Sequence, residues 1–194
     1  MSERNKNYNN ISDEELIRLS SNGDNNAFSE LYERYSKKIY FFLLRMLFND
    51  EEKSKDFVQN VFIRIIEKSE SFDNTKSFKT WVFTIAANLC KNEYRHQEIK
   101  EKQEKSSNSN ISVNTEESII NNIDIDSFNN QLIIEINKLD DEHKSIFTLK
   151  FQQNLSLAEI SEIVDCPLGT VKSRLFYTLK NMAKKLTVYN PNIK

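Results

Sequence analysis

Apolar residues recur every three or four positions through most of the chain, the spacing that puts them on one face of an α-helix. In the N-terminal part this pattern predicts a helix that opens at Ser12, a second from about Asp24, a third over about 57–66 and a fourth over about 78–96. The residues from Ser12 to Glu15 have capping-box spacing, which marks a helix start. The expected apolar stripe of the third helix is Phe57, Val58, Val61, Phe62, Ile65 and Ile66.

The periodic pattern fades over residues 97–127, which are rich in Glu, Lys, Ser and Asn. Such a composition cannot bury enough apolar area to offset the entropy lost on ordering the chain. We therefore expect a flexible linker here, with a short helical turn from Ile119 to Ile125 as its most ordered part.

Helical spacing returns over residues 128–190. Asp140 is the expected cap of one helix, and a capping box that starts at Ser156 opens a short helix that ends near Asp165. A longer basic helix follows from Pro167. Two helices joined by a tight turn, the second of them basic, are typical of a helix-turn-helix. The predicted fold is therefore all-α, with two small helical domains and a linker between them.

Composition supports this class and excludes others. The chain has two glycines and two prolines, so it is poor in the residues that tight sheet turns require. No apolar run approaches the roughly 18 to 20 residues needed to span a bilayer, and the N-terminus is polar, so we expect a cytoplasmic protein. Cys90 and Cys166 lack metal-ligand spacing and are expected to be buried thiols. We expect no metal and no cofactor.

Charge points to nucleic acid at one place only. The net charge of −2 argues against indiscriminate binding, but residues 168–186 carry basic side chains and no acidic one. The N-terminal end of the second helix of a helix-turn-helix enters the major groove. Lys172 or Arg174 could donate to guanine, Ser173 could bond to a base or a phosphate, and Thr170 is suited to phosphate. The later lysines, Lys180, Lys184 and Lys185, are better explained as solvated surface than as DNA contacts.

Four segments resemble, in order, bacterial sigma factors of the extracytoplasmic-function group in the sigma-70 family. They are AFSELYERYSKKIYFF, DFVQNVFIRI, SFKTWVFTIAANLCKNEYR and LSLAEISEIVDCPLGTVKSRL. The resemblance implies that residues 1–96 form the region 2 domain, which binds the coiled coil of the polymerase's largest subunit and opens the −10 element. It implies that residues 128–190 form the region 4 domain, which binds the −35 element and the polymerase flap. An anti-sigma factor is a further expected partner.

The resemblance also implies roles for particular residues of the third helix. Asp56, Gln59 and Phe62 match the polymerase-contact positions of the family, although an ordinary packed helix is the alternative and Phe62 can be a packed residue at the same time. This sequence departs from the family beside them, because Lys55 and Asn60 stand where acidic residues are common.

The fourth helix is the expected contact for the opened −10 strand. Asn88 and Asn92 are four residues apart and share a face, where amides can read the edge of an extruded base. In the family the preceding loop, here about 71–79, forms the base pocket, and an aromatic ring near it could stack on the base. The residues expected to contact the single strand are Phe78, Asn88, Lys91, Asn92 and Arg95.

For the −35 element the resemblance points to the exposed side of the last helix. Family members often have Arg where Tyr177 stands, so the promoter preference cannot be copied from a relative. The residues expected to contact this duplex are Thr170, Lys172, Ser173, Arg174, Phe176 and Tyr177.

Two other classes were weighed. A free-standing regulator that binds an operator as a dimer would have a similar recognition helix, but it would not account for the Asn-bearing fourth helix or the polymerase-contact block. An enzyme is disfavoured because the sequence shows no nucleophile–base pair, no Gly-rich phosphate loop and no metal-ligand cluster, and His96 and His143 are isolated.

Overall fold

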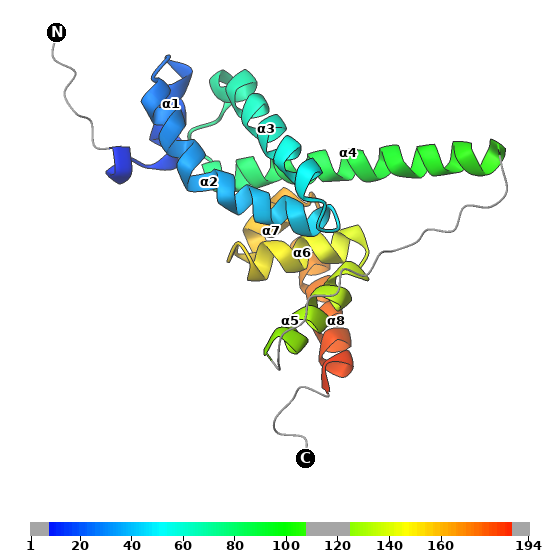
Figure 1. Cartoon of the computed structure of the whole chain (residues 1–194). Coiled ribbons are helices and arrows are strands. Elements are labelled where there is room, and N and C mark those ends of the chain that lie inside the picture. The colour runs from blue at the N-terminus through cyan, green and yellow to red at the C-terminus, as the bar shows by residue number, and fades with distance from the viewer. Residues whose placement is uncertain (1–7, 108–124, 188–194) are drawn as a thin grey trace, which may run out of the picture.

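A computed structural model of the chain describes residues 8–107 and 125–187, and every regular element in these two ranges is a helix (Figure 1). In chain order the elements are η1 (Tyr8–Asn10), α1 (Asp13–Ser21), α2 (Asn25–Met46), α3 (Glu51–Lys68), η2 (Ser69–Ser71), α4 (Phe78–Ser107), α5 (Ile125–Asn137), α6 (Asp141–Phe151), α7 (Leu157–Ile163) and α8 (Leu168–Lys185). The predicted all-α fold is confirmed.

Side-chain oxygens cap most of these helices and satisfy backbone amides that have no partner within the helix. Ser12 accepts from the N–H of Glu15, and the predicted capping box of α7 is formed in both directions between Ser156 and Glu159. Asp24, Asp50 and Asp140 cap α2, α3 and α6 in the same way. The helix starts predicted at Ser12, Asp24, Asp140 and Ser156 are therefore confirmed.

Helices α1 to α4 enclose a core that is rich in aromatic rings. Phe42, Phe78 and Phe83 are completely buried, and the Phe42 and Phe83 rings meet edge to face with their centroids 5.6 Å apart. The expected stripe of α3 is only partly internal, since Val61 and Ile65 are buried while Ile66 is 56% exposed. Ile66 therefore follows the helical spacing of α3 but lies on its exposed side.

The expected linker also differs from the structure at its start. Helix α4 does not end near residue 96 but continues to Ser107, and Figure 1 shows its second half projecting from the packed helices. Residues of this extension are good helix formers, so they can stay helical without a core. The helical turn was expected from Ile119 to Ile125. Residues 119–124 lie outside the described residues, and Ile125 is the first residue of α5.

Helices α7 and α8 form the predicted helix-turn-helix. Asp165 supplies the left-handed conformation of the turn, with φ of 51°, which Asp tolerates better than most residues do. The small core beneath these helices is aliphatic and includes Ile146, Leu149 and Ile160, all completely buried.

The two helical units pack against each other in one continuous buried cluster. Helix α7 lies against α4, and α6 lies against α2 (Figure 1). The sequence predicted two tethered domains and gave no sign of this contact. No helix in the described ranges is long and apolar enough to cross a membrane. Cys90 is buried, which raises the pKa of its thiol to about 12, whereas Cys166 is only half-buried.

Candidate nucleic-acid and polymerase interfaces

The recognition helix α8 has one buried and one open side. Val171, Leu175 and Met182 face the core, while Lys172 and Ser173 are exposed. Phe176 and Tyr177 are 60% and 59% exposed, which is unusual for large apolar side chains. The helix thus presents one cation, one hydroxyl and two aromatic rings together. Thr170 lies at the edge of this side and is half-buried.

Arg174 does not join the open side. Its guanidinium forms an ion pair with Glu142 at the start of α6. The pair turns the side chain back toward the body of the helix-turn-helix and ties α8 to α6. The sequence could not show this, because the two residues belong to different helices. In this arrangement Arg174 is a structural cation rather than a free donor to the groove.

The late lysines of α8 differ in whether they form an ion pair. Lys185 forms an ion pair with the buried Glu135, 2.6 Å from Nζ to Oε2, and Lys138 reaches the other oxygen of that carboxylate at 2.8 Å. Hydrogen bonds from these two lysines hold the pKa of Glu135 below its usual value. Lys180 and Lys184 stay exposed.

The amide-bearing face of α4 is open as expected. Asn88, Lys91, Asn92 and Arg95 are all exposed, and their spacing places them on neighbouring parts of the helix surface. Two amides and two cations are thus within reach of one nucleic-acid strand.

Phe78 does not belong to this face. It is completely buried, and its ring packs against Tyr35, Phe72 and Trp81 with centroid distances of 5.2, 5.9 and 5.8 Å. A ring enclosed in this way has no free face on which a base could stack. The expected stacking role of Phe78 is therefore not available in this structure, where the residue anchors the start of α4.

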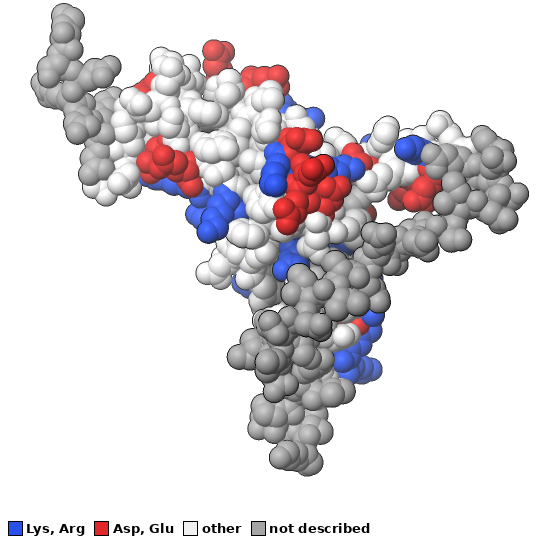
Figure 2. Space-filling view, viewed as in Figure 1, with Lys and Arg blue, Asp and Glu red and all other residues white. Residues whose placement is uncertain are grey.

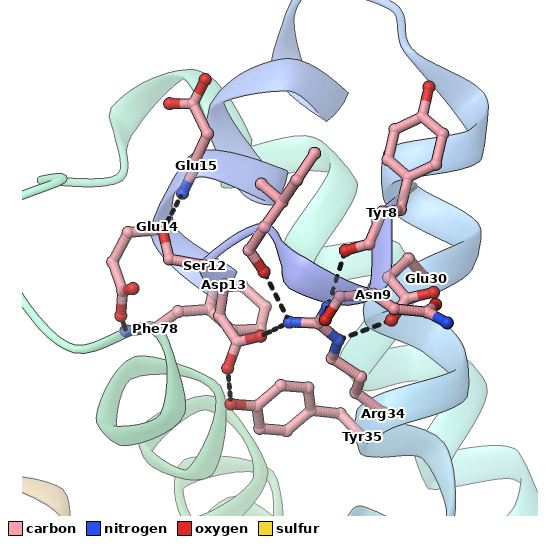
Figure 3. Close-up of polar contacts among 11 residues, drawn as sticks. Tyr8, Asn9, Ser12, Asp13, Glu14, Glu15, Glu30, Arg34, Tyr35 and Phe78 are labelled. Atoms are coloured by element: carbon pink, nitrogen blue, oxygen red, sulfur yellow. Dashed lines mark hydrogen bonds and ion pairs between the residues drawn. The ribbon is translucent and has the colours of Figure 1, made fainter. Parts of the chain in front are cut away.

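A polar network that the sequence did not indicate positions the same end of α4 (Figure 3). Arg34 donates to Asp13 at 2.7 Å and to the carbonyl of Ile11 at 2.9 Å, which fastens the N-terminal segment and α1 onto α2. Glu14, next in α1, accepts from the backbone N–H of Phe78 at 2.9 Å. Helix α1 therefore caps α4 from outside and fixes where the preceding loop ends.

Tyr35 completes this network, since its hydroxyl donates to Asp13. Burial, reinforced by Asp13, raises the pKa of the Tyr35 hydroxyl well above its usual value. No local pattern could reveal these partners, because they lie more than twenty residues apart in the sequence.

The expected polymerase face of α3 is only partly exposed. Asp56 and Gln59 are exposed, but Phe62 is 4% exposed and packs on Phe28 and Tyr32, with ring centroids 6.0 and 4.6 Å away. Phe62 thus offers almost no surface to a partner and instead holds α3 onto α2.

Ile63, which the sequence pattern did not single out, and Ile66, expected in the apolar stripe, complete the exposed face of α3. Ile63 and Ile66 are 50% and 56% exposed, and they follow Gln59 by four and seven residues, so they continue the side that carries Asp56. The signal for them was present in the sequence, since the apolar positions of α3 are too many for one narrow stripe. The two residues that depart from the family, Lys55 and Asn60, are both exposed. The Nζ of Lys55 lies 3.7 Å from a carboxylate oxygen of Glu51.

Charge is unevenly placed on the surface. In Figure 2 acidic side chains gather near the centre of the view, where α3 begins, and basic ones are visible along α8. The exposed acidic residues at the start of α3 are Asp50, Glu51, Glu52 and Asp56.

Comparison with known proteins assigns both parts of the chain. Residues 31–99 match the sequence profile of sigma-70 region 2, and residues 136–184 match that of sigma-70 region 4. The chain is 31% identical over 181 residues to the ECF RNA polymerase sigma factor SigW of Bacillus subtilis. The matched residues cover 88% of this chain and 94% of SigW. The chain belongs to the extracytoplasmic-function sigma factors. Regions 2 and 4 of this sigma factor bind core RNA polymerase and promoter DNA.

Other relatives agree. The ECF RNA polymerase sigma-E factor of Haemophilus influenzae is 30% identical over 188 residues, covering 91% of this chain and 96% of the relative. Relatives of this kind are transcription initiation factors rather than enzymes.

Solved structures share the fold. The sigma factor RpoE of Bartonella quintana, solved with the anti-sigma factor NepR, aligns with a TM-score of 0.65 at 22% identity and covers 83% of this chain and 97% of its own. CnrH, solved with the cytosolic domain of CnrY, aligns with a TM-score of 0.67 at 18% identity. The alignment covers 91% of this chain and 97% of CnrH.

Proposed function

We propose that this sigma factor directs transcription from promoters whose −35 element is read by α8 and whose −10 element is opened on α4, while α3 holds core polymerase. The observation that carries the proposal is the exposed face of α4, where Asn88, Lys91, Asn92 and Arg95 lie together inside the region 2 match. An exposed recognition helix lies separately inside the region 4 match.

Opening the −10 element requires that a base leave the duplex stack, which costs a few kcal/mol. The amides of Asn88 and Asn92 can hydrogen-bond the edge of such a base, and Lys91 and Arg95 can hold the phosphates of the separated strand. Since Phe78 is buried, the binding energy comes from these amide and cationic contacts.

At the −35 element the donors are Lys172 and Ser173, with Phe176 and Tyr177 beside them. Lys can donate to guanine in the major groove, and an aromatic ring can contact a thymine methyl group. Because Glu142 holds Arg174, this contact set depends on Lys172 for its positive charge.

The polymerase contact is proposed for the exposed side of α3. Asp56 and Gln59 supply polar contacts, and Ile63 and Ile66 supply the apolar area that the core of an interface needs. We further propose an anti-sigma factor as a partner, because a sigma factor of the same fold was solved in complex with the anti-sigma factor NepR. When this sigma factor is mixed with the anti-sigma factor, it is expected to lose its binding to core polymerase.

The deciding experiment is transcription in vitro with core polymerase and a promoter library. Promoter-specific start sites are expected, and Asn88→Ala or Lys172→Ala is expected to reduce them about tenfold or more, as for loss of a specific contact. Lys184→Ala, which removes an exposed lysine at the far end of α8, is the matched control and should leave them within about twofold of the unmodified protein.

Failure of the purified chain to bind core polymerase would overturn the proposal. Tight, sequence-specific binding to duplex DNA by the chain alone would favour the dimeric regulator instead.

A further inference from the structure

The contact between the region 2 and region 4 units includes specific polar bonds. The loop between α6 and α7 enters it through Gln153, which is only 8% exposed. The carbonyl of Gln153 accepts from Lys79 Nζ at 3.0 Å, and its amide nitrogen Nε2 donates to the carbonyl of Lys38 at 3.3 Å. Lys79 ends the segment, about 71–79, that by resemblance to the family forms the pocket for the −10 base. Closure of the two units therefore occupies a cation that the open chain could offer to DNA.

The most unusual group in this contact is Lys144 of α6. It is completely buried, and its Nζ has no hydrogen-bond partner among the described residues. The ammonium lies 3.7 Å from the centroid of the Phe48 ring, which belongs to the turn between α2 and α3 in the other unit. An ammonium over a ring face is attracted by the π electrons. Burial lowers the pKa of Lys144, and the carboxylates of Asp141 and Asp140 oppose that shift.

Phe48 is itself held in an uncommon conformation. Its φ is 56°, in the left-handed region where a bulky side chain is strained, and the residue as a whole remains 54% exposed. The same turn is fixed by Tyr94, whose hydroxyl donates to the carbonyl of Met46, and the Tyr94 ring meets the Phe48 ring with centroids 6.2 Å apart. Strained residues persist where the surrounding structure holds them, and they concentrate at functional sites.

We propose that the contact between Lys144 and Phe48 is an intramolecular latch that holds regions 2 and 4 closed in the free sigma factor and releases when the chain engages polymerase and promoter. The closed state combines attractive terms with a strained turn and a desolvated amine. The cost of desolvating the amine offsets part of its attraction to the ring, so a competing interaction can shift the equilibrium toward the open state.

Opening is required by geometry, and this step rests on the proposed function. Positions −35 and −10 are about 25 base pairs apart, which at about 3.4 Å per base pair is roughly 85 Å along the duplex. A compact chain of this length has a radius of gyration of about 16 Å and is thus about 40 Å across. Helices α4 and α8 cannot both reach their elements while the two units remain packed together.

The test measures closure in the full-length free protein, without polymerase or DNA. Donor and acceptor dyes are placed at Glu67→Cys and Lys184→Cys, both exposed positions in different units, in a Cys166→Ala background. Buried Cys90 is retained, because its raised thiol pKa makes it a poor target for labelling. Energy transfer between the dyes reports the ratio of closed to open molecules.

Phe48→Asn is the informative variant, because Asn tolerates the left-handed conformation but removes the ring. The closed-to-open ratio is expected to fall roughly 2- to 30-fold, the range for an ammonium on a ring face. Phe48→Tyr keeps the ring and should keep the ratio. In a Lys144→Ala background the change from Phe48 to Asn should have little further effect, because no side chain at position 144 then reaches the ring.

A role limited to shaping the turn predicts the opposite, since Asn would relieve strain and leave closure unchanged or stronger. That result, or an equal effect of Phe48→Asn with and without Lys144, would overturn the latch. Phe48→Leu, which keeps apolar volume without a ring, gives the same test if Asn lowers the helix content measured by circular dichroism. Because no polymerase is present, failure of the transcription experiment would not affect this result.

Discussion

The two helical units of this sigma factor are built from different interiors. Region 2 packs aromatic rings, among them Phe42, Phe78 and Phe83, whereas the buried apolar residues described in region 4 are aliphatic and smaller in number. A small unit buries a smaller share of its surface and is less stable alone. Region 4 also rests on region 2 through α6 and α7. The comparison indicates that region 2 is the more rigid unit and that region 4 gains stability from it in the closed arrangement.

The difference suits the proposed tasks. Opening DNA requires amides and cations held in fixed positions, and α4 is anchored by the aromatic core and by Glu14. Reading a duplex requires only that a preformed helix enter a groove. A unit that must also move between closed and open arrangements can have a modest core.

The largest expected effect comes from emptying either core. Phe42→Ala should lower the free energy of unfolding by about 3–5 kcal/mol and Ile146→Ala by about 2–5 kcal/mol, because both side chains are completely buried. If region 4 depends on region 2, Phe42→Ala should speed amide hydrogen exchange in both units. Ile146→Ala should speed it mainly in α5 to α8, as read by mass spectrometry of exchanged peptides.

The opposite pattern would break the comparison. Rapid exchange throughout region 2 in the Ile146→Ala protein, with region 4 protected in the Phe42→Ala protein, would make region 4 the more rigid unit.

The sequence predicted what is encoded locally. Helix starts depend on a cap and the few residues after it, so Ser156 and Asp140 could be recognised without any knowledge of the fold. The exposed Asn88 and Lys172 could be found because helical spacing separates the open side from the core.

What the sequence missed depends on partners from distant segments. The ion pair of Arg174 with Glu142 joins two helices, and the contact of Lys144 with Phe48 joins two units. Phe62 was assigned to a surface by resemblance, yet its burial is decided by Phe28 and Tyr32 of another helix. Periodicity gives a face of a helix, but it does not say which neighbour covers that face.

An intermediate effect is expected from the helix caps, where the chain offers a matched pair. Ser156 accepts from Glu159 N–H at 3.2 Å, and the Glu159 carboxylate accepts from Ser156 N–H at 2.7 Å. Ser12 makes only the first kind of bond, at 3.3 Å, because the Glu15 carboxylate is paired with Arg18. Ser156→Ala should therefore cost about 1 kcal/mol and Ser12→Ala less. Urea unfolding measures both, and a larger loss for Ser12→Ala would contradict the expectation that the reciprocal bonds make the cap at Ser156 the stronger of the two.

The smallest expected effect is a dependence on pH at the same cap. The hydrogen bond with Ser156 holds the pKa of Glu159 below its usual value of 4.5. A carboxyl group whose pKa is lower in the folded state stabilises the fold above its unfolded pKa, and this contribution is lost as the pH falls through the folded value.

At pH 7 Glu159→Gln should lower the unfolding free energy by a few tenths of a kcal/mol, on the order of a charge near a helix start. As the pH falls from 4.5 through the lower pKa of the folded state, the difference from the unmodified protein should shrink toward zero, because the carboxyl becomes protonated in both states. Glu162→Gln, an exposed position in the same helix, is the control and should show no such convergence. A Glu159→Gln difference that stayed constant from pH 7 to pH 3 would mean that the side chain stabilises α7 by shape rather than by charge, and region 4 would then depend on packing in the same way as region 2.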